Sequence, residues 1–589
     1  MVAVLGKITE EFHVKISFRE FITANTIEKM ASLIEGKKGI LKETIYKHKE
    51  HNVDTEYDEF PLTDVQMAYL IGRNEGIALG GISTHGYYEI LTHLNIRKLE
   101  ESLNKVIEIQ PMLRAIISKS GTQKILKEVP RYRISENDIR GYTDEEQENV
   151  IKTERQRMSH YVFDTEKWPL FEFKAFRTDE EEYYLFVGID LLIADGGSVR
   201  IFIRQLLDFY YDRFDKNRQN AFTFKDYVEA LNDFSESSTY KEDKDYWMEQ
   251  ISLIPPAPML PLQKDPSVIR KPQFARIEKV IPKSEWNVLQ KEAKKKGITT
   301  STLLCTAYAL VLGYWSNQPE LTINVTVFTR YPFNEGVTDI VGDFTSVILL
   351  RVNLLGRSDF WKLASEIQNQ LMDALEHRHY DGMNVIRKIA EQAEMKEQAV
   401  MPVVFTSLLF SMEEGDIVTI EDLGEVKMGV SQTSQVYLDY QVMETKEGLL
   451  ITWDYIKELF TPNMISTMFK QYINIVESLS KNVISMPHLD SKEQEVFTAY
   501  NDTKLDMPIL PIQTTFKKIA EKYPEKILIA DNTGGVTCHQ VDKQSSQIAN
   551  YLLNQKIKRG DVIAVLGNRR KETIITVSYT HLRAHETLA

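Results

Sequence analysis

Two carboxylates and a hydroxyl stand close together in one apolar stretch, Asp190-Leu-Leu-Ile-Ala-Asp195-Gly-Gly-Ser198. Two carboxylates at a turn between a strand and a helix could act as general acid and general base. They could also cap the helix and pair with a buried arginine, because buried carboxylates usually exist as satisfied pairs. Residue chemistry alone favours the structural interpretation and leaves the catalytic one open.

A second candidate is the hydroxyl of Thr406 in Met401-Pro-Val-Val-Phe-Thr406-Ser407, an apolar segment that predicts a strand. The alternative is an ordinary strand threonine, which is common. A third segment, Ser431 to Gln441, alternates polar and apolar residues, so strand geometry predicts one shared face. That face, either solvated or lining a polar cavity, would hold Gln435, Tyr437, Asp439 and Gln441.

Common catalytic signatures are missing from the sequence. It contains no phosphate-binding loop, no His-Glu-x-x-His motif and no Gly-x-Ser-x-Gly nucleophile elbow. His377 and His379 flank Arg378, but zinc sites need three or four ligands and no third stands beside them. We therefore expect a polar helix face there and no metal site.

The elements that must position these residues alternate between helix and strand. Thr63 and Gln66 match a capping box at the start of a helix. Residues 183–189 predict a strand that runs into the Asp190 turn, and residues 199–210 a helix after it. Because Pro255-Pro-Ala-Pro258 interrupts this mixture, we expect two α/β lobes, about 57–220 and 221–490.

Composition limits the kind of protein. The 589 residues carry a net charge of -14, which suits neither nucleic-acid backbones nor anionic membranes as partners. The only cysteines, Cys305 and Cys538, are far apart in sequence, so we do not expect a disulfide framework. We expect a cytoplasmic location instead. The start of the chain lacks the pattern of a signal peptide, and no apolar run reaches the ~18 residues of a membrane span.

Taken in order, the motifs resemble the heterocyclization (Cy) domain of nonribosomal peptide synthetases, a member of the condensation-domain superfamily. The resemblance spans about residues 57–490. It rests on Phe60 to Arg73, Pro111-Met-Leu-Arg114, the Asp-x-x-x-x-Asp-x-x-Ser signature of 190–198, Gly342 to Ser346, Pro402 to Ser407 and Gln435 to Gln441. Ordinary condensation domains carry His-His-x-x-x-Asp-Gly where this chain has Asp190 to Gly196, which argues against simple condensation or epimerization.

The resemblance implies two chloramphenicol-acetyltransferase-like lobes in a V-shaped pseudodimer, with a tunnel between them. Carrier-bound thioesters would enter from opposite ends. The implied reaction joins an upstream acyl thioester to carrier-bound Cys, Ser or Thr, then cyclizes and dehydrates the product to a thiazoline or oxazoline. No cofactor is expected on the domain itself, since the substrates arrive on the phosphopantetheine of carrier domains.

By the same resemblance, Asp439 is the candidate acid–base group and Thr406 its partner. Supporting or tunnel-lining roles are implied for Gln435, Gln441, Ser407 and Tyr437. Asp190, Asp195 and Ser198 are assigned to architecture, with Arg330 as the expected partner of Asp195. Thr329 stands where the family has an asparagine before that arginine.

The flanks resemble neighbouring synthetase domains. Residues 1–36 resemble the last part of a peptidyl carrier protein, whose phosphopantetheine serine would precede Met1, and 37–56 read as an exposed linker. Residues 491–577 resemble the start of an adenylation domain, and 578–589 look like foreign sequence. We expect a monomer within a larger synthetase. Two alternatives to heterocyclization remain: a condensation-only enzyme and a noncatalytic carrier-docking module.

Overall fold

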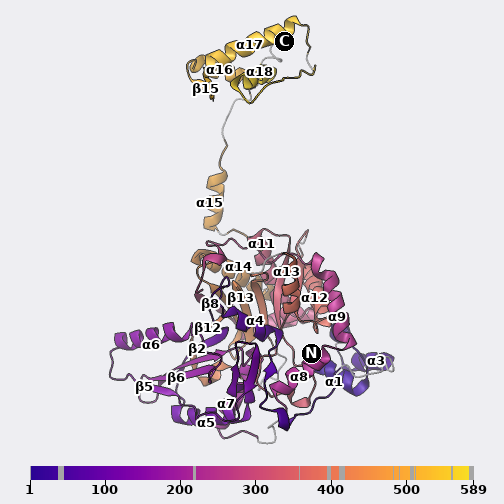
Figure 1. Cartoon of the computed structure of the whole chain (residues 1–589), viewed down its shortest axis with the longest axis vertical. Helices are drawn as coiled ribbons and strands as arrows, with labels where there is room; N and C mark the ends of the chain where they lie inside the picture. Colours follow the sequence, from indigo (N-terminus) through magenta and orange to yellow (C-terminus); the bar gives the residue numbers. More distant parts are fainter. Residues whose placement is uncertain are drawn as a thin grey trace. The chain divides into compact units, whose positions relative to one another are not determined.

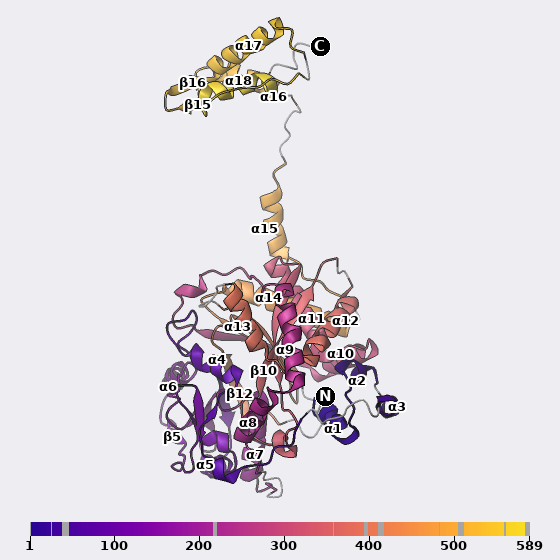
Figure 2. The ribbon, with the colours of Figure 1, turned by 45° about the vertical axis from the view of Figure 1, so that its right-hand side comes forward.

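The computed structural model describes residues 2–24, 26–37, 46–215, 221–356, 359–393, 399–409, 418–481, 483–489, 491–504, 510, 512–558 and 561–582. The chain divides into two compact units, Met1–His488 and Leu489–Ala589. The larger unit contains two α/β lobes, each built on its own sheet (Figures 1 and 2).

The later lobe is built on a six-stranded sheet in the order β10-β9-β11-β13-β14-β8. β11 runs parallel to both its neighbours, and the other pairs are antiparallel. The strands are β8 (Phe274–Pro282), β9 (Glu320–Phe328), β10 (Thr345–Asn353), β11 (Val403–Leu408), β13 (Leu438–Glu444) and β14 (Gly448–Ile456).

Helices bury one face of this sheet. The apolar α11 fills the centre of the core, where buried Tyr308 packs beside Tyr440, Trp453 and Tyr472. Its capping threonine, Thr299, explains where the helix begins. The helices of this lobe are α9 (Ser238–Gln250), α10 (Lys283–Lys295), α11 (Thr300–Ser316), α12 (Phe360–Glu376), α13 (Gly382–Gln392) and α14 (Pro462–Ser480).

The earlier lobe has a five-stranded sheet in the order β12-β2-β7-β6-β5. Its strands are β2 (His85–Thr92), β5 (Ser135–Asp138), β6 (Phe171–Arg177), β7 (Tyr183–Asp190) and β12 (Glu425–Gln432). A small sheet, β1-β4-β3, adds β1 (Phe60–Pro61), β3 (Ala115–Ile117) and β4 (Thr122–Ile125). The helices are α4 (Asp64–Gly72), α5 (Ile96–Ile109), α6 (Asp144–Met158), α7 (Gly196–Tyr210) and α8 (Phe224–Phe234).

The two lobes share chain segments and do not divide at one point near residue 220. β12 follows β11 in the sequence, yet it pairs with β2 of the earlier lobe. α8 lies beyond residue 220, yet its apolar face belongs to the same core as α5 and α7. Exchange of β12 therefore ties the lobes together beside the turn that leads into β13.

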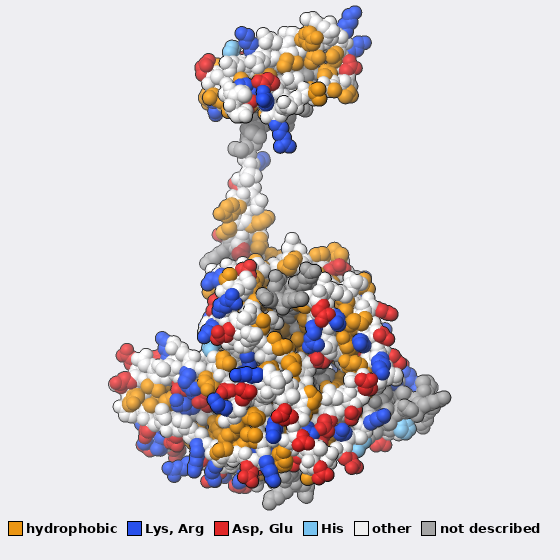
Figure 3. Space-filling view, in the orientation of Figure 1, with side chains coloured by type: hydrophobic (Ala, Val, Ile, Leu, Met, Phe, Trp, Pro, Cys, Tyr) orange, Lys and Arg blue, Asp and Glu red, His pale blue; other side chains and the backbone are white. Residues whose placement is uncertain are grey.

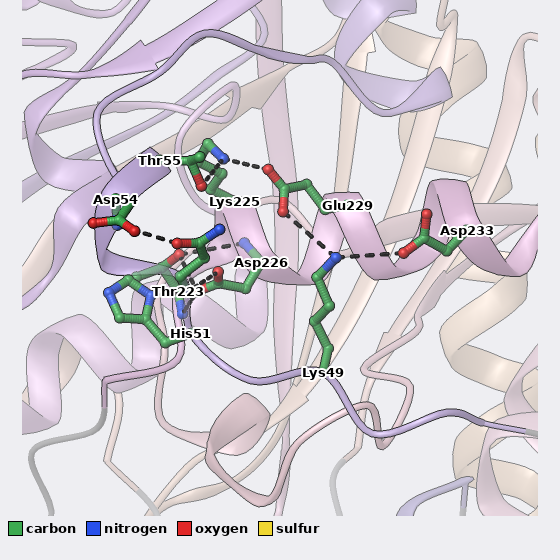
Figure 4. Close-up of polar contacts among 10 residues, drawn as sticks. Lys49, His51, Asp54, Thr55, Thr223, Lys225, Asp226, Glu229 and Asp233 are labelled. Atoms are coloured by element: carbon green, nitrogen blue, oxygen red, sulfur yellow. Dashed lines mark hydrogen bonds and ion pairs between the residues drawn. The ribbon is translucent and has the colours of Figure 1, made fainter.

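Residues 46–56, the second part of the expected exposed linker, form a polar strap along α8 (Figure 4). Lys49 Nζ lies 3.6 Å from Glu229 Oε2 and 3.3 Å from Asp233 Oδ2, and His51 Nδ1 lies 2.8 Å from Asp226 Oδ2. Residues 38–45 of the expected linker lie outside the described residues. These contacts fix the chain that enters the earlier lobe.

At its start the strap reaches His379, one of the two histidines that sequence reasoning placed on a polar helix face. That expectation is wrong for His379, which is only 9% exposed. Its Nε2 lies 2.9 Å from the hydroxyl of Tyr46, and its Nδ1 lies 2.7 Å from Asp243 Oδ2. His377 Nδ1 lies 3.1 Å from the other oxygen of Asp243, so both imidazole rings contact one carboxylate.

The first helices, α1 (Val2–Phe12), α2 (Phe18–Thr23) and α3 (Ile27–Lys37), pack together and against Met372 of α12. The smaller unit contains α15 (Ser491–Asn501), α16 (Ile512–Lys522), β15 (Ile527–Asp531), β16 (Gly534–Thr537), α17 (Cys538–Asn554) and α18 (Lys571–Leu582). Residues 578–582 of the expected foreign tail continue α18, and 583–589 lie outside the described residues.

No single helix in the described ranges is long and apolar enough to cross a membrane; α10 and α11 reach that length only together and meet at 98°. Acidic and basic side chains intermingle on the face that Figure 3 shows.

Candidate active site

A cavity of about 250 Å³ lies between the lobes. The earlier lobe contributes α4, the start of α7 and parts of β2 and β7 to its wall, and the later lobe contributes the exposed face of the six-stranded sheet. A cavity with mostly apolar walls and a few polar groups is typical of a small-molecule site.

Strand alternation selects the residues that line it. On the four neighbouring strands, every second residue faces the cavity: Thr345 and Val347 on β10; Asn324, Thr326 and Phe328 on β9; Val404, Thr406 and Leu408 on β11; Asp439, Gln441 and Met443 on β13. The residues between them, such as Phe405 and Tyr440, belong to the core on the other face.

The alternation of side chains along β11 also determines which face of the sheet Ser407 occupies. It follows Thr406 directly, so it faces α11, where its Oγ lies 2.8 Å from Ser301 Oγ. Ser407 does not line the cavity. The sequence alone predicts that Thr406 and Ser407 cannot both face the cavity, because consecutive strand residues point to opposite faces of a sheet.

Asp439 and Thr406 meet inside the cavity. Gln441 Nε2 donates to Asp439 Oδ2 at 2.8 Å, and Thr406 Oγ1 donates to Asp439 Oδ1 at the long distance of 3.5 Å. The Thr406 hydroxyl also lies 3.0 Å from Thr326 Oγ1. The structure therefore brings together three of the residues singled out in the sequence.

Burial dominates the electrostatics of Asp439. Its side chain is almost buried, and loss of hydration raises the pKa of the carboxyl to about 7 against an ordinary 3.8. The hydrogen bond from Gln441 lowers this pKa, and the neighbouring Asp454 carboxylate raises it. A carboxyl with such a pKa can both accept and donate a proton near neutral pH.

An ion pair that sequence reasoning missed stands beside Asp439. Asp454 is its register partner on β14, and Arg276 is the register partner of Asp454 on β8. The guanidinium binds Asp454 through both oxygens, at 2.9 and 2.6 Å; Asp454 is fully buried, and the Arg276 side chain is 10% exposed. An aspartate in the apolar strand Gly448–Ile456 was the available signal, since a buried charge needs a partner.

The carboxylates of the Asp190–Ser198 turn bind the surrounding scaffold, and Asp195 also lines the cavity. Asp190 forms a buried ion pair with Arg73 and accepts a hydrogen bond from the Leu192 amide. Asp195 caps α7 by accepting from the Ser198 amide at 2.5 Å, and its other oxygen accepts from the Phe344 amide at 3.0 Å.

Arg330 supports this turn chiefly through Ser198. Its Nη2 donates to Ser198 Oγ at 2.8 Å and lies 3.7 Å from Asp195 Oδ1, so the expected pair with Asp195 is the longer contact. Nη1 donates to the carbonyls of Val337 and Ile340. Thr329 is buried beside it and donates to the Phe344 carbonyl at 3.4 Å, as part of the same scaffold.

The prediction that four residues share one strand face is wrong for two of them. Gln435 lines the cavity, but it lies before β13 in a left-handed conformation with φ of 61°. Tyr437 also precedes the strand and lines a separate cavity of about 490 Å³ with Leu79 and Leu262. Only Asp439 and Gln441 occupy the strand.

The cavity is also lined by a tyrosine that sequence reasoning did not single out. Tyr69 on α4 lines the cavity, and burial raises its pKa well above the ordinary 10. The nearby carboxyl groups of Asp343 and Asp439 raise it further. No group of three or more His, Cys, Asp or Glu side chains among the described residues could hold a metal ion.

Comparison with known proteins identifies the family to which this fold belongs. Residues 57–504 match the condensation-domain family. Bacitracin synthase 1 of Bacillus licheniformis is 35% identical over 575 residues, 97% of this chain and 11% of that protein. Phenyloxazoline synthase MbtB of Mycobacterium tuberculosis is 27% identical over 577 residues, 96% of this chain and 40% of that protein. The chain thus spans well under half the length of these relatives.

Among solved structures, the EpoB cyclization-docking bidomain of the nonribosomal peptide synthetase from Sorangium cellulosum matches with a TM-score of 0.72. The two share 30% identity, and the match covers 82% of this chain and 99% of that one. The expected fold of two α/β lobes resembling chloramphenicol acetyltransferase is confirmed. The chain belongs to the condensation-domain family of nonribosomal peptide synthetases.

Proposed function

We propose that residues 57–490 form a heterocyclization domain that joins two carrier-bound substrates and closes a thiazoline or oxazoline ring. The observation that carries this proposal is Asp439, a buried carboxyl with a pKa of about 7 that lies in the cavity between the lobes with Thr406 and Gln441. The names of MbtB, a phenyloxazoline synthase, and of the EpoB cyclization bidomain support it.

The first step forms an amide. The amine of carrier-bound Cys, Ser or Thr attacks the carbonyl carbon of the upstream thioester, and the phosphopantetheine thiol leaves. This step needs orientation above all, and holding both reactants in one cavity supplies it.

Asp439 serves the next two steps. As a carboxylate it accepts the proton of the side-chain thiol or hydroxyl while the new S–C or O–C bond forms and the carbonyl electron pair moves to oxygen. The oxygen then takes up a proton from solvent water to become a hydroxyl. Asp439, now the acid, protonates this hydroxyl, which leaves as water while the nitrogen loses its proton to solvent and the C=N bond forms. A pKa near neutral suits both roles.

Thr406 and Gln441 position this carboxyl. Gln441 holds Oδ2, and Thr406 bridges Oδ1 and the Thr326 hydroxyl, which limits the orientations that Asp439 can adopt. Gln435 contributes to the cavity wall.

The flanks fit the same proposal. The similarity to bacitracin synthase 1 extends over 575 residues, beyond the family match at both ends. We assign residues 1–36 to a carrier protein, 37–56 to the connection and 491–577 to an adenylation domain. The partners are then upstream and downstream carriers loaded through phosphopantetheine.

Intact-protein mass spectrometry of the acceptor carrier tests the function. A donor carrier loaded with an acyl group and an acceptor carrier loaded with cysteine are mixed with the full chain. Acyl transfer with loss of one water is the expected result. Transfer without loss of water would identify a condensation-only enzyme, and no transfer a docking module.

Two neighbouring residues provide a matched pair of variants. Thr406→Val removes the hydroxyl beside Asp439, and Ser407→Ala removes one on the opposite face, against Ser301. We expect slower water loss in the first variant and the wild-type rate in the second. Equal rates in both would contradict the role given to Thr406.

A further inference from the structure

Tyr88 is a cavity residue that the reaction scheme leaves unused. It lies on β2 and lines the cavity from the side of the earlier lobe. Among the described residues its hydroxyl has no hydrogen-bond partner, whereas the hydroxyl of Tyr69, the other tyrosine of this wall, bonds to Thr345. A polar atom that borders a cavity and is unpaired within the protein is available to a ligand.

Two glycines make room for the ring of Tyr88. Gly86 precedes it by two residues on the same face of β2, and Gly429 of β12 is its register partner. A β-carbon at Gly86 would lie 3.6 Å from Tyr88 Cε2, and a β-carbon at Gly429 would lie 3.2 Å from Tyr88 Cδ1. The ring therefore packs against both glycines, which restricts the positions that its hydroxyl can adopt.

The second of these glycines brings Tyr88 close to the row of Asp439. A β-carbon at Gly429 would also lie only 2.8 Å from Arg276 Nη1, so the Tyr88 ring and the Arg276 guanidinium flank one backbone position. Arg276 is the register partner of Asp454, and Asp454 is that of Asp439. Tyr88 and Asp439 thus border the same part of the cavity from opposite lobes.

The hydroxyl of Tyr88 can act as a hydrogen-bond donor there. Burial raises its pKa above the ordinary 10, although the nearby guanidinium of Arg276 lowers it. The hydroxyl is therefore protonated at neutral pH and can donate to a carbonyl oxygen.

The acceptor substrate has a carbonyl that would lie on this side. During ring closure the thiol and the attacked carbonyl carbon become members of the new ring, and the thiol lies beside Asp439, which takes its proton. The α-carbon of the cysteine is tetrahedral, so its thioester carbonyl projects from the face of that ring. A ring that lies on the six-stranded sheet directs this carbonyl toward the earlier lobe and Tyr88.

We propose that Tyr88 is a substrate-positioning residue whose hydroxyl donates a hydrogen bond to the thioester carbonyl oxygen of the carrier-bound acceptor. The inference rests on the proposed heterocyclization and adds a contact from the earlier lobe to it. The same carbonyl is present during amide formation and during ring closure, so the contact holds the acceptor in both steps. Because it binds ground state and transition state alike, its loss should raise KM and leave kcat unchanged.

Kinetics of the full chain with loaded carriers test this contact. Ring closure is measured on a carrier loaded chemically with the linear acyl-cysteine thioester, and amide formation on a carrier loaded with cysteine, both by mass spectrometry. We expect Tyr88→Phe to raise the KM for either carrier by roughly 5-fold, the usual effect of one neutral hydrogen bond, with kcat and the pH–rate profile unchanged. Tyr87→Phe is the matched control, because it removes a hydroxyl that bonds to Glu89 on the opposite face of β2, and its KM should equal that of the wild type.

A modified acceptor identifies the atom that Tyr88 binds. In a carrier that holds the cysteine through a thioether, a methylene group replaces the thioester carbonyl. The wild-type chain and Tyr88→Phe should then have the same KM, since neither can make the contact.

The outcomes separate this inference from the proposed function. An unchanged KM in Tyr88→Phe, a fall in kcat alone, or a difference in KM that persists with the thioether carrier would overturn the role of Tyr88 and leave ring closure in place. The variant should melt at the wild-type temperature, because it loses no hydrogen bond within the protein, and a lower temperature would count equally against the proposal. If the wild-type chain forms the amide without closing the ring, the proposed function fails, and the KM for amide formation still decides the role of Tyr88.

Discussion

Replacing Asp439 with asparagine should stabilise the folded chain while it removes ring formation. The folded carboxyl has a pKa of about 7, and its ordinary value is 3.8. Between these values the unfolded chain loses the proton and the folded chain keeps it, so rising pH favours the unfolded state. Asparagine does not titrate and avoids this loss.

The magnitude follows from the size of the pKa difference. Each pH unit is worth about 1.4 kcal/mol, so a difference of about 3 corresponds to about 4 kcal/mol once the pH exceeds 7. At pH 5 the same linkage gives only about 1–2 kcal/mol. The stabilisation by Asp439→Asn should therefore grow by roughly 2–3 kcal/mol between pH 5 and pH 8.

Tryptophan fluorescence during urea unfolding can follow this difference. All six tryptophans lie within Met1–His488, so the signal reports the unit that contains the site. Glu128→Gln, at an exposed carboxylate, is the control and should show no growth with pH. A stability difference for Asp439→Asn that stays constant from pH 5 to pH 8 would refute the buried, neutral carboxyl.

Three further changes test the neighbourhood of the site. Gln441→Leu removes a hydrogen bond that lowers the pKa of Asp439, so the bend in the pH–rate profile of ring closure should move above pH 7; a bend at lower pH would contradict this cause. Asp195→Ala uncaps α7 and leaves Arg330 without its carboxylate, and should cost about 3–5 kcal/mol in urea unfolding; a loss below about 1 kcal/mol would be inconsistent with a supporting turn. Arg276→Met leaves Asp454 buried and unpaired and should cost about 3–5 kcal/mol, much of which Asp454→Leu should restore in the double variant; additive losses would count against the pair.

Much of the site could be predicted from local patterns. Alternation along β11 and β13 predicts that Thr406, Asp439 and Gln441 sit on strands with one polar face, and the capping pattern at Thr63 predicts where α4 begins. The turn from Asp190 to Ser198 was expected to be structural, and its carboxylates accept hydrogen bonds from the Leu192 and Ser198 amides.

What could not be predicted depends on contacts between distant segments. Exchange of β12 into the earlier sheet sets the turn that contains Gln435 and Tyr437, so alternation could not be extended back through them. The pair of Arg276 and Asp454 joins strands almost 180 residues apart in sequence.

The same limit applies to the strap. Its polar composition suggests an exposed linker, but Lys49 and His51 find carboxylates on α8 that no local pattern pairs with them. Whether a polar segment is held in place depends on the charged side chains of the surface beside it, and only the folded structure brings that surface next to the segment.

The mass of the acceptor carrier after reaction with Asp439→Ala tests the central claim most directly. Because Asp439 acts only after the amide has formed, this variant should still transfer the acyl group and should accumulate the linear amide without loss of water. Melting at or above the wild-type temperature would show that the variant is folded. Loss of water at the wild-type rate from this variant would contradict the assignment of Asp439 as the acid–base group.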